Sequence, residues 1–135
     1  MPELLTDPLI FPDWPAPARV RAVSATRQGG VSSPPYDSLN LAGHVGDDPI
    51  YVTENRRRLA AAIGLSAKPA WLDQVHGSVV VAAETVDAPV AADAAWTRAS
   101  GRACVVMTAD CPPVLLCDRA GAVVAAAHAG WRGLA

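Results

Sequence analysis

Cys111, His128 and His76 carry side chains that can bind a metal ion or act as nucleophile and base. A thiolate and two imidazoles suit zinc, because a catalytic zinc typically takes three protein ligands of this kind and leaves a fourth position to water or substrate. Simpler interpretations stay open, since a lone strand histidine is commonly structural and a lone cysteine is commonly a small buried hydrophobe. A metal-free pair, with Cys111 as nucleophile and His128 as base, is a further alternative.

A predicted hairpin brings Cys111 towards His128. Residues 114–118 and 122–128 are apolar runs typical of strands, and residues 119–121 between them fit a three-residue loop with a glycine at the left-handed position. If the strands pair directly beside this loop, Pro112 lies opposite His128, and Cys111 is one residue further along. A bulge in the loop would place Cys111 opposite His128. In either register their Cβ atoms lie within ~4.5–8 Å, so we expect the two side chains at the open end of the hairpin.

The third ligand candidate, His76, lies in a predicted strand. Residues 74–82 alternate between polar and apolar side chains, which places His76 on the polar face. The other two cysteines, Cys104 and Cys117, lie inside apolar runs and are expected in the core.

A helix is predicted over residues 49–63. Asp48 is a suitable N-cap, Pro49 suits the first helical position, and Gly64 suits the position directly after the helix. Arg56–Arg58 form the one basic cluster of the sequence, and we expect them on a solvated face of this helix.

Two further strands are predicted, over residues 19–26 and residues 102–107. The first runs into a loop rich in glycine and proline that opens with Arg27, and the second ends before two successive prolines, which stop normal ladder pairing. Residues 1–18 are expected to form an extended lead-in.

Length and composition favour one domain with a core of small side chains. The 135 residues are 51% hydrophobic but only 5% aromatic. A net charge of −2 without a long basic run argues against nucleic-acid binding. No apolar stretch approaches the ~20 residues that span a bilayer, and the N-terminus does not resemble a secretory signal. Three cysteines without a C-x-x-C motif indicate a reducing compartment, so we expect a cytoplasmic protein without membrane partners.

Five sequence blocks, in a fixed order and spacing, carry a family resemblance from Arg27 onward. They are TRQGGVSSPPYDSLNLAGHVGDDP, ENRRRLA, WLDQVHGSVVV, TADCPPVLLCD and AAAHAGWRG. Together they resemble the family once called multicopper polyphenol oxidoreductase (laccase-like), now regarded as purine nucleoside phosphorylases with adenosine deaminase side activity. The sequence departs from the family pattern at Trp96, where a smaller residue is usual, and at Cys104, where leucine is common.

The resemblance implies a mixed α/β fold, with β-sheets packed against helices in a single compact domain, here residues 19–135. It also implies zinc bound by His76, Cys111 and His128, and purine nucleoside and phosphate as substrates. Copper, and with it polyphenol oxidation, is the alternative that the older family name suggests. A non-catalytic zinc-stabilised binding module is a rival of a different class.

Three further residues are site candidates. Arg27 is the candidate for binding phosphate, because a guanidinium fork and free loop amides suit an oxyanion. Asp110 is a candidate for proton transfer or for orienting a histidine ligand, and the second role is favoured. Asn40 is expected to line the substrate pocket, with a turn-stabilising role as the alternative. The role of His44 stays open between substrate contact and a local cap or turn, and that of Arg132 between facing the site and a surface position.

The resemblance also creates an expectation about the C-terminal part of the fold. Members of the family continue past GWRG with a helix and further strands, whereas this sequence stops two residues later, at Ala135. We therefore expect an exposed sheet edge that favours self-association or low stability, and little activity from the chain alone.

Overall fold

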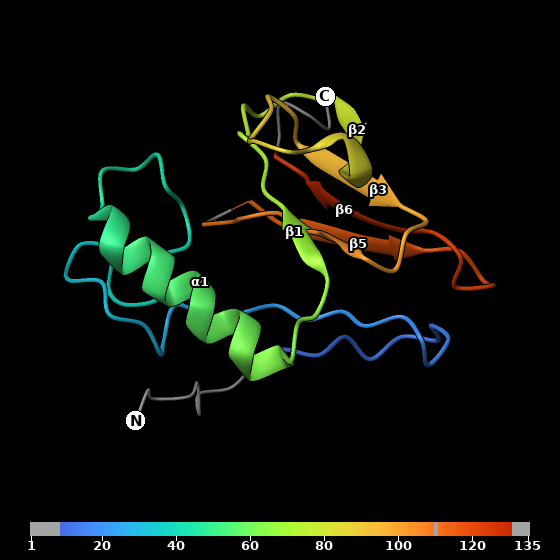
Figure 1. The fold of residues 1–135 in the computed structure, drawn as a ribbon, viewed down its shortest axis with the longest axis horizontal. Coiled ribbons are helices and arrows are strands. Elements are labelled where there is room, and N and C mark those ends of the chain that lie inside the picture. The colour runs from blue at the N-terminus through green and yellow to red at the C-terminus, as the bar shows by residue number, and fades with distance from the viewer. Residues whose placement is uncertain (1–8, 110, 131–135) are drawn as a thin grey trace. The chain divides into compact units, whose positions relative to one another are not determined.

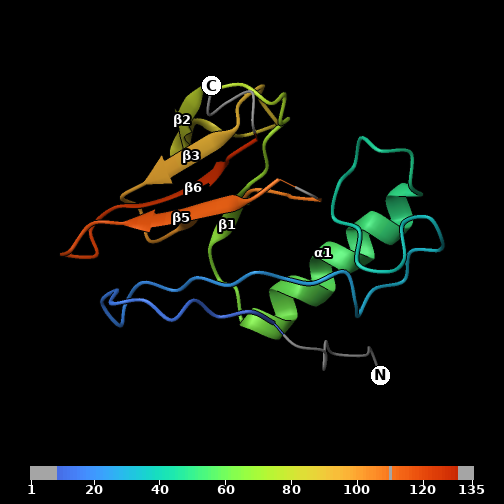
Figure 2. The same cartoon turned by 180° about the vertical axis from the view of Figure 1, so that it is seen from behind.

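A computed structural model describes residues 9–109 and 111–130. It confirms the mixed α/β class, with one long helix and two β-sheets (Figures 1 and 2). The chain divides into two compact units. The first takes the described residues up to Asp13 together with Ala22–Ser66, and the second takes Trp14–Arg21 together with the described residues from Ala67 onward. The predicted division into residues 1–18 and 19–135 stays a prediction.

The first unit is built around helix α1, Pro49–Ile63, which has the predicted bounds. The Asp48 side chain accepts a hydrogen bond from the Ile50 N–H at 2.9 Å, and so satisfies one of the free donors of the first turn. At the other end Gly64 adopts φ 61°, a left-handed conformation that glycine takes without steric cost. Local capping chemistry therefore fixes both ends of the helix.

The inner face of α1 is polar at its centre. Asn55 is 0% exposed, and its side chain accepts from the Val31 N–H and donates to the Ser32 hydroxyl and the Asn40 carbonyl. Two of the three arginines predicted to be solvated are half-buried, because they bind loop carbonyls instead. Arg56 donates twice to Leu41, and Arg58 donates to Gly29. The loop between residues 29 and 41 is thus attached to the helix by side chains.

The strand predicted over residues 19–26 is not present. Only Ser24 pairs, in an isolated bridge with Ile10. The Val20 N–H donates to the Pro17 carbonyl at 2.9 Å, so the chain turns where the strand was expected to begin.

The second unit contains two sheets. In the smaller one, β1 (Lys68–Ala70) pairs in parallel with β4 (Arg102–Cys104). The larger has the strand order β2-β3-β6-β5. Its strands are β2 (Val80–Ala82), β3 (Ala94–Thr97), β6 (Val124–His128) and β5 (Pro113–Cys117), and the 3-10 turn η1 (Ala83–Thr85) follows β2.

The core of this unit consists of small side chains, as the composition predicts. Its buried members are Ala70, Leu72, Ala83, Val86, Ala92 and Ala95. Cys104 packs against this cluster, in agreement with its predicted place in the core.

The predicted hairpin of β5 and β6 is present, but its register differs from both predicted ones. Pro113 lies opposite His128, so the pairing is shifted by one residue. The cause lies in the loop, where the Asp118 carboxylate accepts the N–H groups of Ala122 and Val123. Ala122 thereby becomes a loop residue, and the loop has four residues instead of three. Pro113, the second of the two successive prolines at 112 and 113, fits within β5 because this strand is at the edge of the sheet.

Two other strand predictions were too long. Residues 74–79 do not form a strand, and His76 instead lies in a bend with φ 61°. The strand predicted over residues 102–107 ends at Cys104, after which the side chain of Gln74 takes both backbone hydrogen bonds of Met107. In both segments a side chain distant in sequence forms hydrogen bonds with backbone groups that a neighbouring strand would otherwise have bound. Asp93 does so for residues 75–77, and Gln74 does so for Met107.

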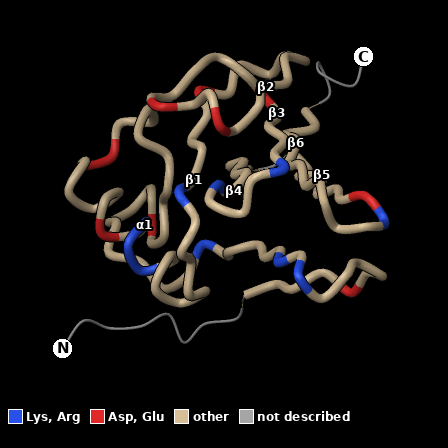
Figure 3. Tube along the Cα trace, turned by 45° about the vertical axis from the view of Figure 1, so that its right-hand side comes forward, with Lys and Arg blue, Asp and Glu red and all other residues tan. Residues whose placement is uncertain are grey.

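Charged residues of both signs are spread along the trace, and the run of arginines on α1 is visible in blue (Figure 3). Among the described residues, no helix is long and apolar enough to span a membrane.

Candidate metal centre

The topology of the larger sheet collects four side chains at one of its ends. His128 is the last residue of β6, and both neighbours of β6 run antiparallel to it. The residues just before β3 and β5, Asp93 and Cys111, therefore lie beside the end of β6. Strand β2 runs parallel to β3, so the loop that precedes it, with His76, is directed to the same end.

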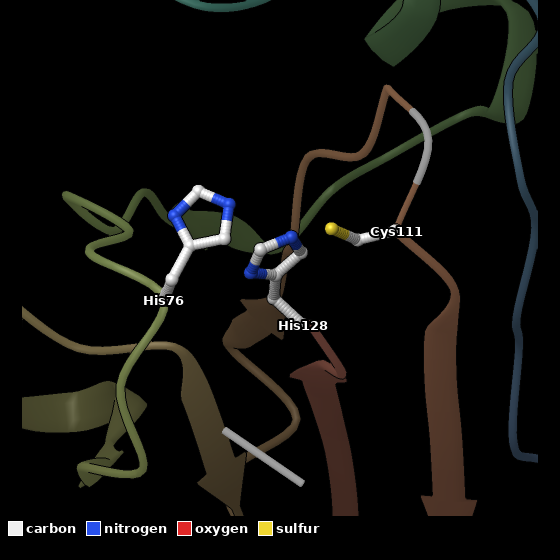
Figure 4. Close-up of side chains that lie close together, drawn as sticks. All are labelled: His76, Cys111 and His128. Carbon is white, nitrogen blue, oxygen red and sulfur yellow. The ribbon is translucent and has the colours of Figure 1, made fainter. Parts of the chain in front are cut away.

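His76, Cys111 and His128 point toward one another (Figure 4), and their ligand atoms all lie within 4.8 Å of one another. The two imidazole rings meet edge to face, with centroids 4.9 Å apart and an interplanar angle of 75°. His128 is buried, Cys111 is half-buried and His76 is exposed, so the group is accessible from the side of His76. These are the three ligands that the sequence predicts.

Asp93 connects the two histidines and was missed by the sequence analysis. Its Oδ2 atom lies 2.8 Å from Nδ1 of His128, and the same oxygen accepts the N–H of His76 at 3.0 Å. Its Oδ1 atom accepts the N–H groups of Val75 and Gly77 at 3.1 and 2.9 Å. One buried carboxylate, 2% exposed, thus shapes the His76 bend and holds the His128 ring.

The environment of Asp93 favours its charged form. Burial raises the pKa of this carboxyl, but the Gly77 N–H, the His128 ring and the N–H groups of Val75 and His76 together lower it by more. The net effect is a pKa below the ordinary value, so the carboxylate stays charged beside His128.

A signal for Asp93 was present in the sequence. In the segment AADAAWT it is a single acid among small apolar residues, and a carboxylate in such a run requires buried hydrogen-bond partners. Asp110, for which the role of orienting a histidine was predicted, lies outside the described residues.

Gly130 packs directly against the three side chains. A Cβ atom at this position would lie 3.2 Å from Cδ2 of His76 and 3.6 Å from both Sγ of Cys111 and Cε1 of His128. The absence of a side chain here lets the backbone after β6 approach the group closely.

The group fits a zinc ion on chemical grounds. Two nitrogen donors and one thiol are zinc ligands, and ordinary zinc bond lengths require ligand atoms about 3.3–3.8 Å apart, so only a small closure from the upper limit of 4.8 Å is needed. Because Nδ1 of His128 is occupied by Asp93, Nε2 is left for a metal, the arrangement usual for metal-binding histidines.

Arg27 and Asn40 lie in the first unit, where both make local contacts. The Arg27 side chain is 72% exposed and donates twice to the Asp37 carbonyl. The Asn40 side chain accepts from the Ala42 N–H, and donates to the Ala42 carbonyl and to Asp47. These contacts support the loop conformation, and the predicted roles of both residues in substrate binding stay predictions.

Of the two cysteines assigned to the core, Cys104 packs against the buried cluster of the second unit. Burial raises the pKa of the Cys104 thiol to about 11, with a further increase from Glu84 and a decrease from Arg102. Cys104 therefore remains protonated at neutral pH and is unsuited to be a nucleophile or metal ligand. Cys117 is half-buried at the end of β5.

Comparison with known proteins shows the family to which this chain belongs. Residues 21–135 match the family described as multi-copper polyphenol oxidoreductase laccase, and the chain belongs to this family. The resemblance predicted from the five sequence blocks is thereby confirmed.

Individual relatives carry the name of a phosphorylase. A purine nucleoside phosphorylase of Pseudomonas aeruginosa is 62% identical over 126 residues, which cover 93% of this chain and 51% of that protein. The purine nucleoside phosphorylase YfiH of Escherichia coli is 59% identical over 129 residues, covering 93% and 52%. A crystal structure of a Neisseria meningitidis protein matches with a TM-score of 0.88 at 52% identity, covering 93% of this chain and 52% of that one. The chain spans about half the length of the curated relatives it matches.

Proposed function

We propose that this chain is part of a zinc-dependent purine nucleoside phosphorylase, with adenosine deaminase as a side activity. The observation that carries the proposal is the group of His76, Cys111 and His128, which offers three zinc donors and is accessible from one side. The names of the relatives supply the substrate class, a purine nucleoside together with phosphate.

The proposed chemistry requires an anion site and stabilisation of charge on the purine. In phosphorolysis a phosphate oxygen bonds to the anomeric carbon while the bond from that carbon to the purine nitrogen breaks, and its electron pair moves onto the purine. A zinc ion with one open position can polarise a substrate atom or activate water. His76, Cys111 and His128 would hold this ion, and Asp93 would keep the ring of His128 in place.

Arg27, Asn40 and Asp110 have proposed roles in substrate binding and proton transfer. The exposed guanidinium of Arg27 contacts the carbonyl of Asp37 and, at 3.5 Å, its carboxylate, and it can exchange these contacts for bidentate hydrogen bonds to phosphate oxygens. Asn40 has a side-chain amide that can contact a nucleoside. Asp110 is the sequence neighbour of Cys111 and is proposed to transfer a proton or to support the ligands.

Copper is the second candidate metal, because the family is described as a multi-copper oxidoreductase and two histidines with one cysteine also suit copper. Phenol oxidation coupled to dioxygen requires several copper ions, commonly with many histidine ligands. This chain has three histidines, and His44, the one outside the group, lies in the first unit. Zinc is therefore the preferred proposal.

The decisive experiment measures phosphate-dependent turnover of adenosine and inosine by this chain, with the free base and the sugar phosphate identified by chromatography. Metal content is determined in parallel on protein purified without chelator. We expect one zinc per chain and little base release from the chain alone, all of which requires phosphate. Ammonia release from adenosine without phosphate reports the deaminase side activity.

Matched variants separate the proposal from its rivals. His76→Ala and Cys111→Ala should lose both zinc and turnover, whereas Cys117→Ala should retain both. Turnover that survives complete zinc removal would favour a cysteine–histidine hydrolase. Zinc binding without turnover of any nucleoside would favour a zinc-stabilised binding module, and copper with phenol oxidation would favour the older family name.

A further inference from the structure

Both histidines of the metal centre are connected through one carboxylate that the family resemblance did not identify. We propose that Asp93 is the positioning residue of the site, which sets the tautomer of His128 and the backbone conformation of His76 before a metal binds. This inference rests on the zinc site proposed above, but not on the identity of the substrate.

The effect on His128 follows from hydrogen-bond chemistry. The 2.8 Å contact between Nδ1 and Oδ2 of Asp93 favours a proton on Nδ1, because a carboxylate only accepts. In a neutral imidazole the other nitrogen, Nε2, then carries the lone pair that a metal needs. Asp93 therefore selects the one tautomer of His128 that can bind a metal through Nε2.

The effect on His76 operates through the backbone. His76 has φ 61°, a left-handed conformation that residues other than glycine rarely adopt. Three successive N–H groups, those of residues 75–77, converge on the Asp93 carboxylate. Such a row of amides forms a concave anion-binding site, so the negative charge of Asp93 compensates the unfavourable conformation and directs the His76 side chain toward the centre.

Asp93 is itself held firmly by the sheet. It directly precedes β3, and its carbonyl accepts the N–H of His128 at 2.7 Å, while its own N–H donates to the Val79 carbonyl at 3.1 Å. Backbone and side chain of the same residue thus contact His128, and the backbone also fixes the segment that leads into β2. A carboxylate placed in this way can hold both histidines without rearrangement when a metal arrives.

Charge supports the same assignment. Two neutral imidazoles and one thiolate around a divalent ion leave one positive charge in a partly buried site. The Asp93 carboxylate, 2% exposed and in contact with a ligand, supplies the compensating negative charge.

The first test uses the unaltered 135-residue chain without metal and without substrate. Nitrogen-15 NMR of the histidine rings at pH 8 reports which nitrogen of His128 carries the proton, with His128→Gln used to assign the signal. We expect a protonated Nδ1 together with an unprotonated Nε2. An unprotonated Nδ1 would overturn the proposal. Because no nucleoside is present, the result is independent of whether the protein is a phosphorylase.

The second test compares Asp93→Asn with Asp87→Asn, a control at an exposed aspartate of the same unit. The asparagine side chain has one acceptor oxygen where the carboxylate has two. We expect this oxygen to take the N–H groups of Val75 and Gly77, which places the NH2 group beside Nδ1, so the His128 proton should move to Nε2. Zinc affinity, measured by competition with a chromophoric chelator, should fall by about 10–100-fold. The control should match the unaltered chain in both measurements.

A purely structural role for Asp93 predicts a different result. In that case Asp93→Asn would lower thermal stability but leave the His128 tautomer and the zinc affinity of the folded fraction within about twofold of the unaltered chain, and the proposal would be wrong. If Asp93→Asn does not fold, the tautomer in the unaltered chain decides the question.

Discussion

The side chain of Gln74 forms two hydrogen bonds with the backbone of Met107, donating to its carbonyl and accepting from its N–H, both at 2.7 Å. Gln74 lies two residues before His76, and Met107 lies four residues before Cys111. The amide therefore connects the segments that carry two of the three proposed ligands. Its role resembles that of Asp93, which connects the segments of His76 and His128.

Gln74→Ala should lower both stability and zinc affinity. A hydrogen bond contributes about 0.5–1.5 kcal/mol, so the loss of two predicts a decrease of about 1–3 kcal/mol in the free energy of unfolding. Urea denaturation and chelator competition measure the two effects. Gln28→Ala is the control, because Gln28 is exposed and lies in the first unit. An unchanged zinc affinity in a folded Gln74→Ala protein would show that this connection does not position the ligands.

Gly130→Ala should weaken zinc binding more than it weakens the fold. The added Cβ would lie 3.2 Å from Cδ2 of His76, so the imidazole or the backbone must shift by a few tenths of an ångström. Gly130 does not have a left-handed backbone, so the substitution adds little conformational strain.

Gly101→Ala is the matched control for this variant, since a Cβ there meets nothing within 4 Å. We expect a zinc affinity reduced by about tenfold in Gly130→Ala, in line with the sensitivity of metal sites to displaced ligands, and no change in Gly101→Ala. Equal affinities of the two variants would contradict the proposed close packing.

The fold is predictable from the sequence where local chemistry determines structure. Helix α1 has the predicted bounds because Asp48 and Gly64 act on the turns beside them. The strand predicted around His76 was wrong because the alternation of residues 74–79 cannot reveal a carboxylate at position 93 that captures three successive N–H groups. Long-range side-chain contacts of this kind have no periodic signature.

The grouping of Cys111 with His128 was correct although the predicted register was not. Both positions lie close to the open end of the hairpin, so a shift of one residue changes which residues face each other but not which end they occupy. The register itself could not be predicted, because it depends on the Asp118 carboxylate, which takes two loop N–H groups and adds Ala122 to the loop.

Cys104 should react with iodoacetamide far more slowly in the folded chain than in the urea-unfolded chain at pH 8. Burial raises the pKa of its thiol from 9.0 to about 11, and only the thiolate reacts. Mass spectrometry of peptides, with the unfolded chain as the control, measures the ratio of rates.

The same pKa predicts the direction of a pH effect on stability. Between pH 9 and about 11 the unfolded thiol ionises while the folded thiol keeps its proton, so stability should fall as the pH rises through this range. Cys104→Ala should remove this part of the pH dependence and retain zinc. Equal labelling rates in folded and unfolded chains would show that the thiol is not protected.

Arg27→Ala should raise the KM for phosphate more than the KM for nucleoside. A hydrogen bond to a charged group contributes about 1.5–3 kcal/mol, which corresponds to an increase of about ten- to a hundredfold. The Arg27 guanidinium also donates to the Asp37 carbonyl, so a purely structural role would affect both substrates. Arg57→Ala, at an exposed arginine of the same unit that pairs with Glu54, should change neither constant. Equal increases for phosphate and nucleoside would assign Arg27 to loop structure.

Strand β5 should mediate self-association of this chain through pairing with a second copy. It is at one end of the sheet, and among the described residues it pairs with β6 alone. Val114 and Leu116, two residues apart on one face of the strand, are 39% and 54% exposed. An edge strand with free backbone groups and exposed apolar side chains favours association with an identical edge.

Sedimentation velocity over a range of concentrations should show dimers or larger species, and Leu116→Lys should shift the distribution toward monomer. Ile50→Lys, a substitution at the 74% exposed Ile50 of α1, is the control and should leave it unchanged. A monomer at every concentration, or an equal effect of both lysine variants, would rule out association through β5.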